Sequence, residues 1–338
     1  MAQLFKTAAC FTDIHYGLKQ NSRLHLEDCE RYVDWFIAEA KARNAETCIF
    51  LGDWNHHRAS ISVATMNASI KAFKKLNAAF ETVYFITGNH DLYYKDKREL
   101  NSIEYTRDLS NFVMVDEHFL QDDVAIIPWL VGDEAKKVKK MEGRYAFGHL
   151  ELPHFFMNAM VQMPDTGEIQ REDFRGLEQV YTGHFHKRQS HNNIIYTGNC
   201  FPHNYADAGD DDRGMTIVEW GKDPVYHSWP QQPRYRVYNL DEMLNNPEEL
   251  LKEKMHIRVN LNIDISYEEA SFIREEFVGK YGLRELTLIP VKKDIMESVA
   301  EPGELKFESV DTIVTNQLTS IESDHYDPNL LLEIYRDL

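Results

Sequence analysis

Short apolar or β-branched runs recur along the first two thirds of the chain, and each has the length of a buried β-strand. We expect strands at Thr7–Thr12, Thr47–Leu51, Val83–Thr87, Ala125–Ile127, Tyr145–Phe147, Val180–Thr182, Ile194–Thr197 and Met215–Trp220. Between them, Leu24–Arg43 and Ser60–Phe80 carry apolar residues at helical spacing, which predicts helices that cover a sheet. The pattern therefore predicts an α/β body over residues 1–222.

A second, smaller module is expected after a proline-rich segment, 223–240, which we interpret as a linker because its prolines break regular structure. The module itself, residues 241–296, is expected to hold two strands and a helix. These elements are His256–Ile265, Tyr267–Tyr281 and Leu286–Val291. Such a β-α-β unit is too small to be stable alone, so we expect it to dock on the body.

The last segment, 297–338, begins with an acidic stretch that contains Gly and Pro and is interpreted as a linker. Two short amphipathic helices are expected after it, within 309–338, and such helices are marginal in water without a surface to pack on. Two interpretations stay open. The helices either dock on a partner protein or fold back on their own domain.

Five of the expected strands run directly into residues that bind metals or transfer protons. The motifs are Asp13-Ile14-His15, Gly52-Asp53, Gly88-Asn89-His90-Asp91, Gly148-His149 and Gly183-His184-Phe185-His186. Since sites gather at the carboxyl ends of strands in layered α/β folds, we expect these residues to share one edge of a sheet. The glycines suggest tight turns in which the backbone approaches a bound ion or phosphate closely.

The residue types indicate which metals the site would take. Imidazole nitrogens mixed with carboxylate and amide oxygens, without clustered cysteine, suit borderline-hard divalent ions rather than a thiolate-rich structural zinc site. Seven such groups exceed the needs of one ion, and two ions about 3.5–4 Å apart clamp both oxygens of a displacement at phosphorus. The sequence therefore predicts a two-metal phosphoesterase centre, with Mn²⁺ expected and Mg²⁺, Fe²⁺ or Zn²⁺ as alternatives.

Composition limits the picture in two ways. A net charge of −18 argues against DNA binding by the chain unaided, although two bound cations and a partner protein would supply positive charge where phosphate must lie. No apolar stretch approaches the ~18 residues that span a bilayer, and the N-terminus enters a strand without a signal-like segment. We therefore expect no membrane partner and a cytoplasmic location, in a bacterium or a phage-infected host.

The ordered set DxH, GD, GNHD, GH and GHxH resembles the calcineurin-type metallophosphoesterases. Within them the chain is most similar to the Mre11/SbcD class of nuclease subunits, and especially to the phage T4-type recombination endonuclease subunit. Secondary markers are Tyr94-Lys95, Pro128-Trp129, Leu150-Glu151 and Tyr196-Thr197-Gly198. The resemblance implies a four-layer αββα sandwich, a capping domain that helps select DNA geometry, and a helical C-terminal tail.

The resemblance also implies roles for individual residues. One ion would be held by Asp13, His15 and His186, and the other by Asn89, His149 and His184. Asp53 would bridge the ions. The expected catalytic residues are His90, which would stabilise the transition state or protonate the leaving oxygen, together with His56 and Asp91. His56 would contact phosphate. The family often has Phe two residues after the bridging Asp, whereas this chain reads Asp53-Trp54-Asn55-His56-His57, so His57 stays an alternative. Asp91 would orient a ligand or His90, or only cap a turn.

Taken together, we expect a metal-dependent nuclease, with exonuclease action on duplex ends and endonuclease action on single strands. The expected partners are DNA and a Rad50/SbcC-like SMC ATPase gripped through 309–338, within a heterotetramer that contains a nuclease homodimer. Its role would be DNA end processing, recombination and repair. The alternatives are a phosphatase or small-molecule phosphodiesterase on the same body, and a metal-free scaffold that has lost the chemistry.

Overall fold

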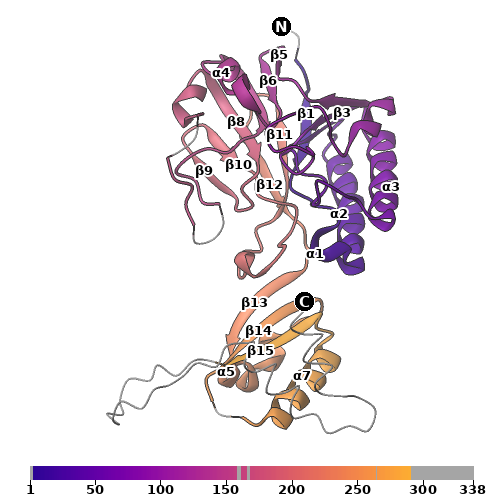
Figure 1. The fold of residues 1–338 in the computed structure, drawn as a ribbon, viewed down its shortest axis with the longest axis vertical. Helices are drawn as coiled ribbons and strands as arrows, with labels where there is room; N and C mark the ends of the chain where they lie inside the picture. Colours follow the sequence, from indigo (N-terminus) through magenta and orange to yellow (C-terminus); the bar gives the residue numbers. More distant parts are fainter. Residues whose placement is uncertain (1–2, 158–160, 166–167, 264, 291–338) are drawn as a thin grey trace, which may run out of the picture. The chain divides into compact units, whose positions relative to one another are not determined.

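The computed structural model describes residues 3–157, 161–165, 168–263 and 265–290. They belong to one compact unit, Met1–Val291. The expected linker and tail helices at 297–338 lie outside the described residues. Two six-stranded sheets make up the body (Figure 1). The first sheet has the order β12-β11-β1-β2-β3-β4. Its strands are β1 (Thr7–Phe11), β2 (Thr47–Phe50), β3 (Thr82–Ile86), β4 (Phe112–Val115), β11 (Gly214–Glu219) and β12 (Val225–Ser228).

The second sheet has the order β5-β6-β7-β8-β10-β9. Its strands are β5 (Phe119–Gln121), β6 (Val124–Ile127), β7 (Gly143–His149), β8 (Leu177–Gly183), β9 (Gln189–His191) and β10 (Ile194–Tyr196). In each sheet four neighbouring strands run parallel, β1 to β4 in the first and β6, β7, β8 and β10 in the second. Parallel strands place their carboxyl ends at one edge, so each sheet presents one set of strand exits.

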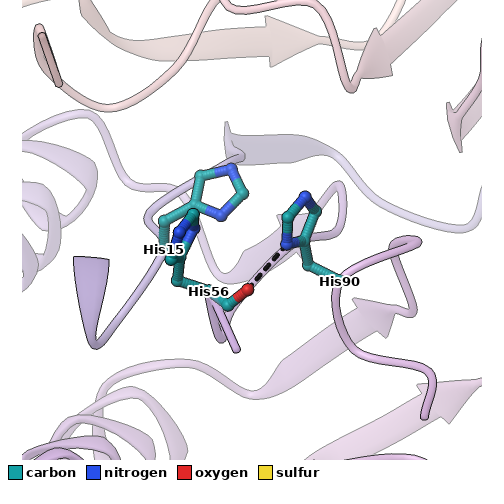
Figure 2. A group of neighbouring side chains, drawn as sticks. All are labelled: His15, His56 and His90. Carbon is teal, nitrogen blue, oxygen red and sulfur yellow. Dashed lines mark hydrogen bonds between the residues drawn. The ribbon is translucent and has the colours of Figure 1, made fainter. Parts of the chain in front are cut away.

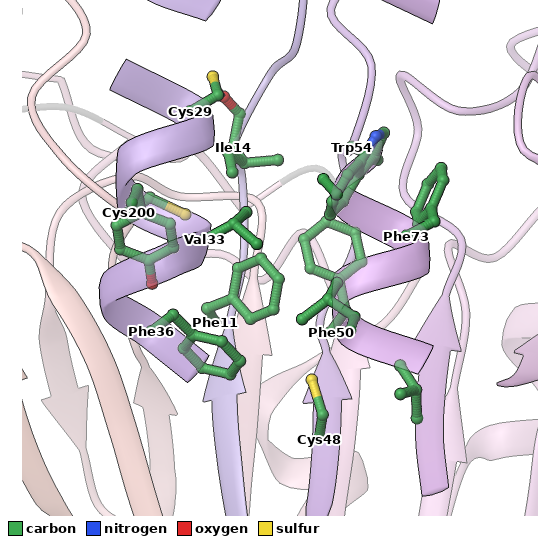
Figure 3. Close-up of a cluster of buried hydrophobic side chains, with 14 of the residues drawn as sticks. Phe11, Ile14, Cys29, Val33, Phe36, Cys48, Phe50, Trp54, Phe73 and Cys200 are labelled. Carbon is green, nitrogen blue, oxygen red and sulfur yellow. The ribbon is translucent and has the colours of Figure 1, made fainter. Parts of the chain in front are cut away.

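Two long helices, α2 (Arg23–Ala42) and α3 (Val63–Ala79), cover the outer face of the first sheet. Aromatic side chains such as Phe11, Phe36 and Trp54 fill the space between helices and sheet (Figure 3). A second core lies between the two sheets, and a third covers the outer face of the second sheet under the short helix α4 (Ala135–Val138). The expected α/β sandwich is therefore confirmed. The remaining helical turns of the body are α1 (Leu18–Asn21), η1 (Glu104–Asp108), η2 (Gly132–Glu134), η3 (Arg171–Phe174) and η4 (Tyr205–Asp207).

The second module is a three-stranded parallel sheet of order β13-β14-β15, packed against helices around its own core. Its elements are β13 (Arg234–Asn239), α5 (Leu240–Asn245), α6 (Pro247–Leu250), β14 (Met255–Leu261), α7 (Tyr267–Tyr281) and β15 (Glu285–Pro290). The expected strands and helix are all present. The interpretation of 223–240 as a linker without regular structure is wrong, because β12 pairs with β11 of the body and β13 pairs with β14. No helix among the described residues is long and apolar enough to cross a membrane.

Candidate metal centre

The seven expected metal-binding side chains come together at the carboxyl ends of both sheets. Asp13, Asp53 and Asn89 follow β1, β2 and β3 of the first sheet, whereas His149 ends β7 and His184 follows β8 of the second. The expectation that they share an edge of one sheet is therefore corrected. The site lies where the exits of two stacked sheets meet, which gives it donors from opposite sides.

The first group consists of Asp13, His15 and His186. His15 Nε2 and His186 Nε2 each lie 3.8 Å from Asp13 Oδ1, an oxygen that is buried and has no hydrogen-bond partner. The other oxygen, Asp13 Oδ2, accepts hydrogen bonds from the Thr12 hydroxyl (2.6 Å) and the His184 N–H (3.0 Å). The carboxylate is thus held in an orientation that leaves Oδ1 free between two imidazoles.

The second group consists of Asn89, His149 and His184. Asn89 Oδ1 lies 3.0 Å from both His149 Nε2 and His184 Nδ1. His149 is fixed from behind, because its Nδ1–H donates to the Leu51 carbonyl at 2.7 Å. His184 Nε2 lies 3.1 Å from Glu151 Oε2. These outer contacts engage the far nitrogens of both rings and direct His149 Nε2 and His184 Nδ1 toward Asn89 Oδ1, the arrangement that is usual for metal-binding histidines.

Asp53 lies between the two groups, with its Oδ2 3.8 Å from His15 Nε2 and 3.5 Å from His149 Nε2. Burial by itself would raise the pKa of Asp53, but the neighbouring histidines, His149 foremost, hold it well below its usual range. Burial would likewise lower the pKa of His149, but the Asp53 carboxylate raises it to about 9. At neutral pH the His149 ring is therefore protonated, and a cation that binds between His149 and Asp53 would have to displace this proton.

Close approach of the chain segments depends on glycine and on unusual backbone angles. A Cβ on Gly88 would lie 2.1 Å from Asp53 Oδ1, and one on Gly183 would lie 2.0 Å from the Thr12 hydroxyl oxygen. Asp53 and His184 have φ of 62° and 88°, in the left-handed region that non-glycine residues rarely adopt. The glycines thus make room for the side chains that form the site, which differs from the expected close approach to an ion or phosphate.

The donor set fits two divalent ions. Donor atoms about 2.1 Å from one ion lie about 3.0–3.4 Å apart, and the separations here begin at that distance and exceed it by at most about 0.4 Å, running from 3.0 to 3.8 Å. The groups Asp13–His15–Asp53 and Asp53–His149–His184 each bring their donor atoms within 4.8 Å of one another and share Asp53. All four cysteines are buried and free, so they offer no competing thiolate site. Binding of ions by these residues stays a prediction.

Two histidines from separate loops, His56 and His90, line the site next to His15 (Figure 2). The His90 Nδ1–H donates to the His56 carbonyl at 2.7 Å, and the His90 N–H donates to Asp53 Oδ1 at 2.8 Å. His90 Nε2 therefore stays available to a substrate. The His56 ring stacks on His90 at 5.4 Å and lies 5.4 Å from His15, whereas the His57 ring contacts the His56 ring at 4.8 Å. Burial lowers the pKa of His56 to about 4. Its position favours His56 over His57 as the residue near phosphate.

Asp91 lies behind the site and is fully buried. Its carboxylate accepts hydrogen bonds from four backbone N–H groups, those of Gly88, Asp53, Trp54 and Asn55, at 2.9 to 3.2 Å. Burial, followed by the charge of Asp53, raises the pKa of Asp91 to about 7. Asp91 therefore joins the loops after β2 and β3. By binding the Asp53 backbone N–H it positions Asp53, which agrees with the expectation that Asp91 orients a ligand.

We predict that Asp91→Asn destabilises the protein by about 2–5 kcal/mol, because one amide NH₂ would face backbone donors and leave them unpaired. Urea unfolding followed by circular dichroism measures this. Asp96→Asn, at an exposed position of the same region, is the control and is expected to change stability by less than about 0.5 kcal/mol. Equal unfolding of parent and Asp91→Asn would contradict the positioning role.

One histidine near the site is not among the expected site residues. The loop after β10 is rich in Asp and Gly, so the sequence alone favours an exposed position for His203 over one that faces the site, but the residue is only 2% exposed. Its ring lies 5.3 Å from His186 and 5.5 Å from His15. Burial, then the charges of these neighbours, holds the pKa of His203 well below its usual value. The signal in the sequence is weak, since only its place shortly after the GHxH motif points to the site.

A cavity of about 400 Å³ opens beside the second group. Its lining includes Lys95, Trp129, His149 and Glu151. Of these, His149 belongs to the second group and Glu151 contacts His184 of that group. The Trp129 ring lies 5.1 Å from His184. The cavity thus presents an aromatic face and an ammonium group beside the candidate metal centre.

Comparisons with known proteins place this geometry in context. Residues 6–207 match the family model described as calcineurin-like phosphoesterase. A curated relative, exonuclease subunit 1 of Enterobacteria phage T4, is 24% identical over 199 residues, which make up 55% of this chain and 57% of the relative. The chain thus spans little more than half the length of this relative.

Similar solved structures have low sequence identity. A dimetal phosphatase from Danio rerio is 13% identical, over 67% of this chain and 96% of its own, with a TM-score of 0.40. Pseudomonas putida nuclease MPE is 20% identical, over 54% and 62%, with a TM-score of 0.30. The phosphoesterase YfcE from E. coli is 13% identical, over 67% and 94%, with a TM-score of 0.35.

Proposed function

Because the chain belongs to the calcineurin-like phosphoesterase family, we propose that it is a metal-dependent DNA nuclease subunit that hydrolyses phosphodiester bonds. The observation that carries the proposal is the convergence of seven donor side chains in two groups that share Asp53. The curated relative, an exonuclease subunit, supports DNA as the substrate. Exonuclease action on duplex ends and endonuclease action on single strands are both part of the proposal.

The residues of the chain divide the work at phosphorus. Two divalent cations would supply an acidified water and neutralise charge on the phosphoryl oxygens. We propose Mn²⁺ because it accepts the mixed nitrogen and oxygen donors of the site. His90, oriented by the His56 carbonyl, presents Nε2 to a phosphoryl or leaving oxygen. The cavity beside His149, with Trp129 and Lys95, would receive the nucleoside next to the scissile phosphate.

A second candidate is a phosphatase or small-molecule phosphodiesterase on the same body, and the net charge of −18 favours it. Incubation of the purified protein with Mn²⁺, labelled single- and double-stranded DNA, p-nitrophenyl phosphate and bis-p-nitrophenyl phosphate separates the two. The nuclease proposal expects DNA shortening and diester cleavage with little monoester turnover. Rapid monoester turnover with intact DNA would overturn it.

We also propose that residues 309–338 bind a Rad50/SbcC-like SMC ATPase, within a heterotetramer that contains two nuclease chains and acts in DNA end processing, recombination and repair. The support is the two apolar stripes in this segment of the sequence. Deletion of 309–338 is predicted to abolish co-purification with such an ATPase while cleavage of bis-p-nitrophenyl phosphate stays at the parent rate. Undiminished co-purification would show that the tail is not the docking element.

A further inference from the structure

His203 is a buried histidine whose two ring nitrogens have no hydrogen-bond partner among the described residues. A buried polar group left unpaired destabilises the folded protein, so folded proteins almost always satisfy such groups. An imidazole with both nitrogens unpaired, next to a cluster of other histidines, therefore indicates a binding partner that is neither backbone nor a neighbouring side chain.

The position of His203 identifies that partner. One nitrogen each of His15, His186 and His203 lie within 4.8 Å of one another. His15 and His186 also surround the unpartnered Asp13 Oδ1. We propose that His203 is a further ligand of the ion held by Asp13, His15 and His186, which rests on the two-ion centre of the proposed function. With Asp53, this gives the ion five protein donors, and Mn²⁺ or Fe²⁺ accommodates up to six.

The loop that carries His203 is held in place by buried polar contacts with Asp207 and Arg213. The His203 N–H donates to Asp207 Oδ2 at 2.9 Å, and Arg213 Nη2 donates to Asp207 Oδ1 at 3.2 Å. Arg213, itself only 1% exposed, also pairs with Asp210 at 2.9 Å. This buried ion-pair network fixes the backbone at His203. The ring itself makes no hydrogen bond and packs between Phe201, at 5.2 Å, and the rings of His15 and His186.

The neighbouring His25 does not compete for the same role. Its Nε2 lies 2.9 Å from the His15 carbonyl and 3.4 Å from Cys29 Sγ, so that nitrogen is engaged with the protein. His25 supports the backbone of His15, whereas His203 faces the side chains of His15 and His186. The two buried histidines thus have different surroundings, and their variants are expected to behave differently.

The test is metal binding by the full-length protein, measured by titration calorimetry with Mn²⁺ and by the visible absorption of bound Co²⁺. For His203→Ala, we expect one of two binding steps to weaken by about 10–100-fold and the Co²⁺ band to change in intensity and position. Added imidazole, which fits the space left by the ring, is expected to restore the parent Co²⁺ band. His191→Ala, at an exposed position of β9, is the control and is expected to bind like the parent.

His203→Asn, which keeps a polar side chain, is the second variant in case the alanine protein folds poorly, and it is expected to show the same weakened step. Parent-like titrations and an unchanged Co²⁺ band in a folded His203 variant would overturn the proposal. A changed band that imidazole does not restore would also overturn it, because the effect would then be a general disturbance of the loop. Neither readout uses a substrate, so the result stands whether or not the protein cleaves DNA.

Discussion

Asp53→Asn is expected to lower the rate of diester hydrolysis by at least about three orders of magnitude, equivalent to about 4 kcal/mol of transition-state stabilisation. The reason is its position, since Oδ2 lies within 3.8 Å of donor nitrogens from both groups. Asparagine keeps an oxygen that can accept the hydrogen bond from the His90 N–H but removes the charge between two cations. Loss of one bridging ligand thus weakens both ion positions at once.

Single-turnover cleavage of bis-p-nitrophenyl phosphate at saturating Mn²⁺, together with Mn²⁺ titration calorimetry, measures both consequences. The exposed Asp96→Asn variant serves again as the control. The expected pattern for Asp53→Asn is a folded protein in which both Mn²⁺ steps weaken. A variant that binds two ions with parent affinity would show that Asp53 is not shared between them.

His90→Asn is expected to reduce kcat by about 10²–10⁴-fold while leaving metal binding unchanged. The ring of His90 contacts His56 and His15 but lies outside the two donor groups centred on Asp53, so its loss removes no expected metal ligand. The Nδ1–H is held by the His56 carbonyl, which leaves Nε2 as the ring nitrogen available to a substrate. Both variants are expected to lose turnover, but only Asp53→Asn is expected to lose metal affinity, and this difference distinguishes the role of His90 from that of Asp53.

The leaving group tells which task His90 performs. If it protonates the leaving oxygen, the loss is large for DNA and small for bis-p-nitrophenyl phosphate, whose leaving group needs no proton. If it stabilises charge on the phosphoryl oxygens, both substrates lose rate equally. His191→Asn is the control for a histidine away from the site. Parent-like kcat for both substrates in His90→Asn would exclude any catalytic part for this residue.

The donor set was predictable because each donor follows its strand within a few residues. The exit motif Gly88-Asn89-His90 directly follows β3, and the continuous apolar run Val83–Ile86 identifies the strand itself. The sequence did not reveal that the exits belong to two sheets, since strand order depends on pairing between distant segments. For the same reason, it could not show that Glu151 would orient His184.

Two further expectations, a linker at 223–240 and an exposed position for His203, were wrong for physical reasons. The prolines of 223–240 end strands rather than abolish them, because Pro224, Pro230 and Pro233 all lie just outside β12 and β13. Both strands are recognised only through their partners, β11 and β14. His203 lies in a polar loop that is typical of the surface, but its ring is buried against His15 and His186, and a contact with a residue as distant in the sequence as His15 cannot be read from the loop itself.

The central claim is that the exits of two sheets hold a pair of cations around Asp53. Anomalous diffraction from crystals soaked in Mn²⁺ tests it most directly. We predict two peaks about 3.5–4 Å apart, one among Asp13, His15 and His186 and the other among Asn89, His149 and His184, with Asp53 in contact with both. A fully loaded crystal without manganese beside Asp53, or with a single peak there, would contradict the account.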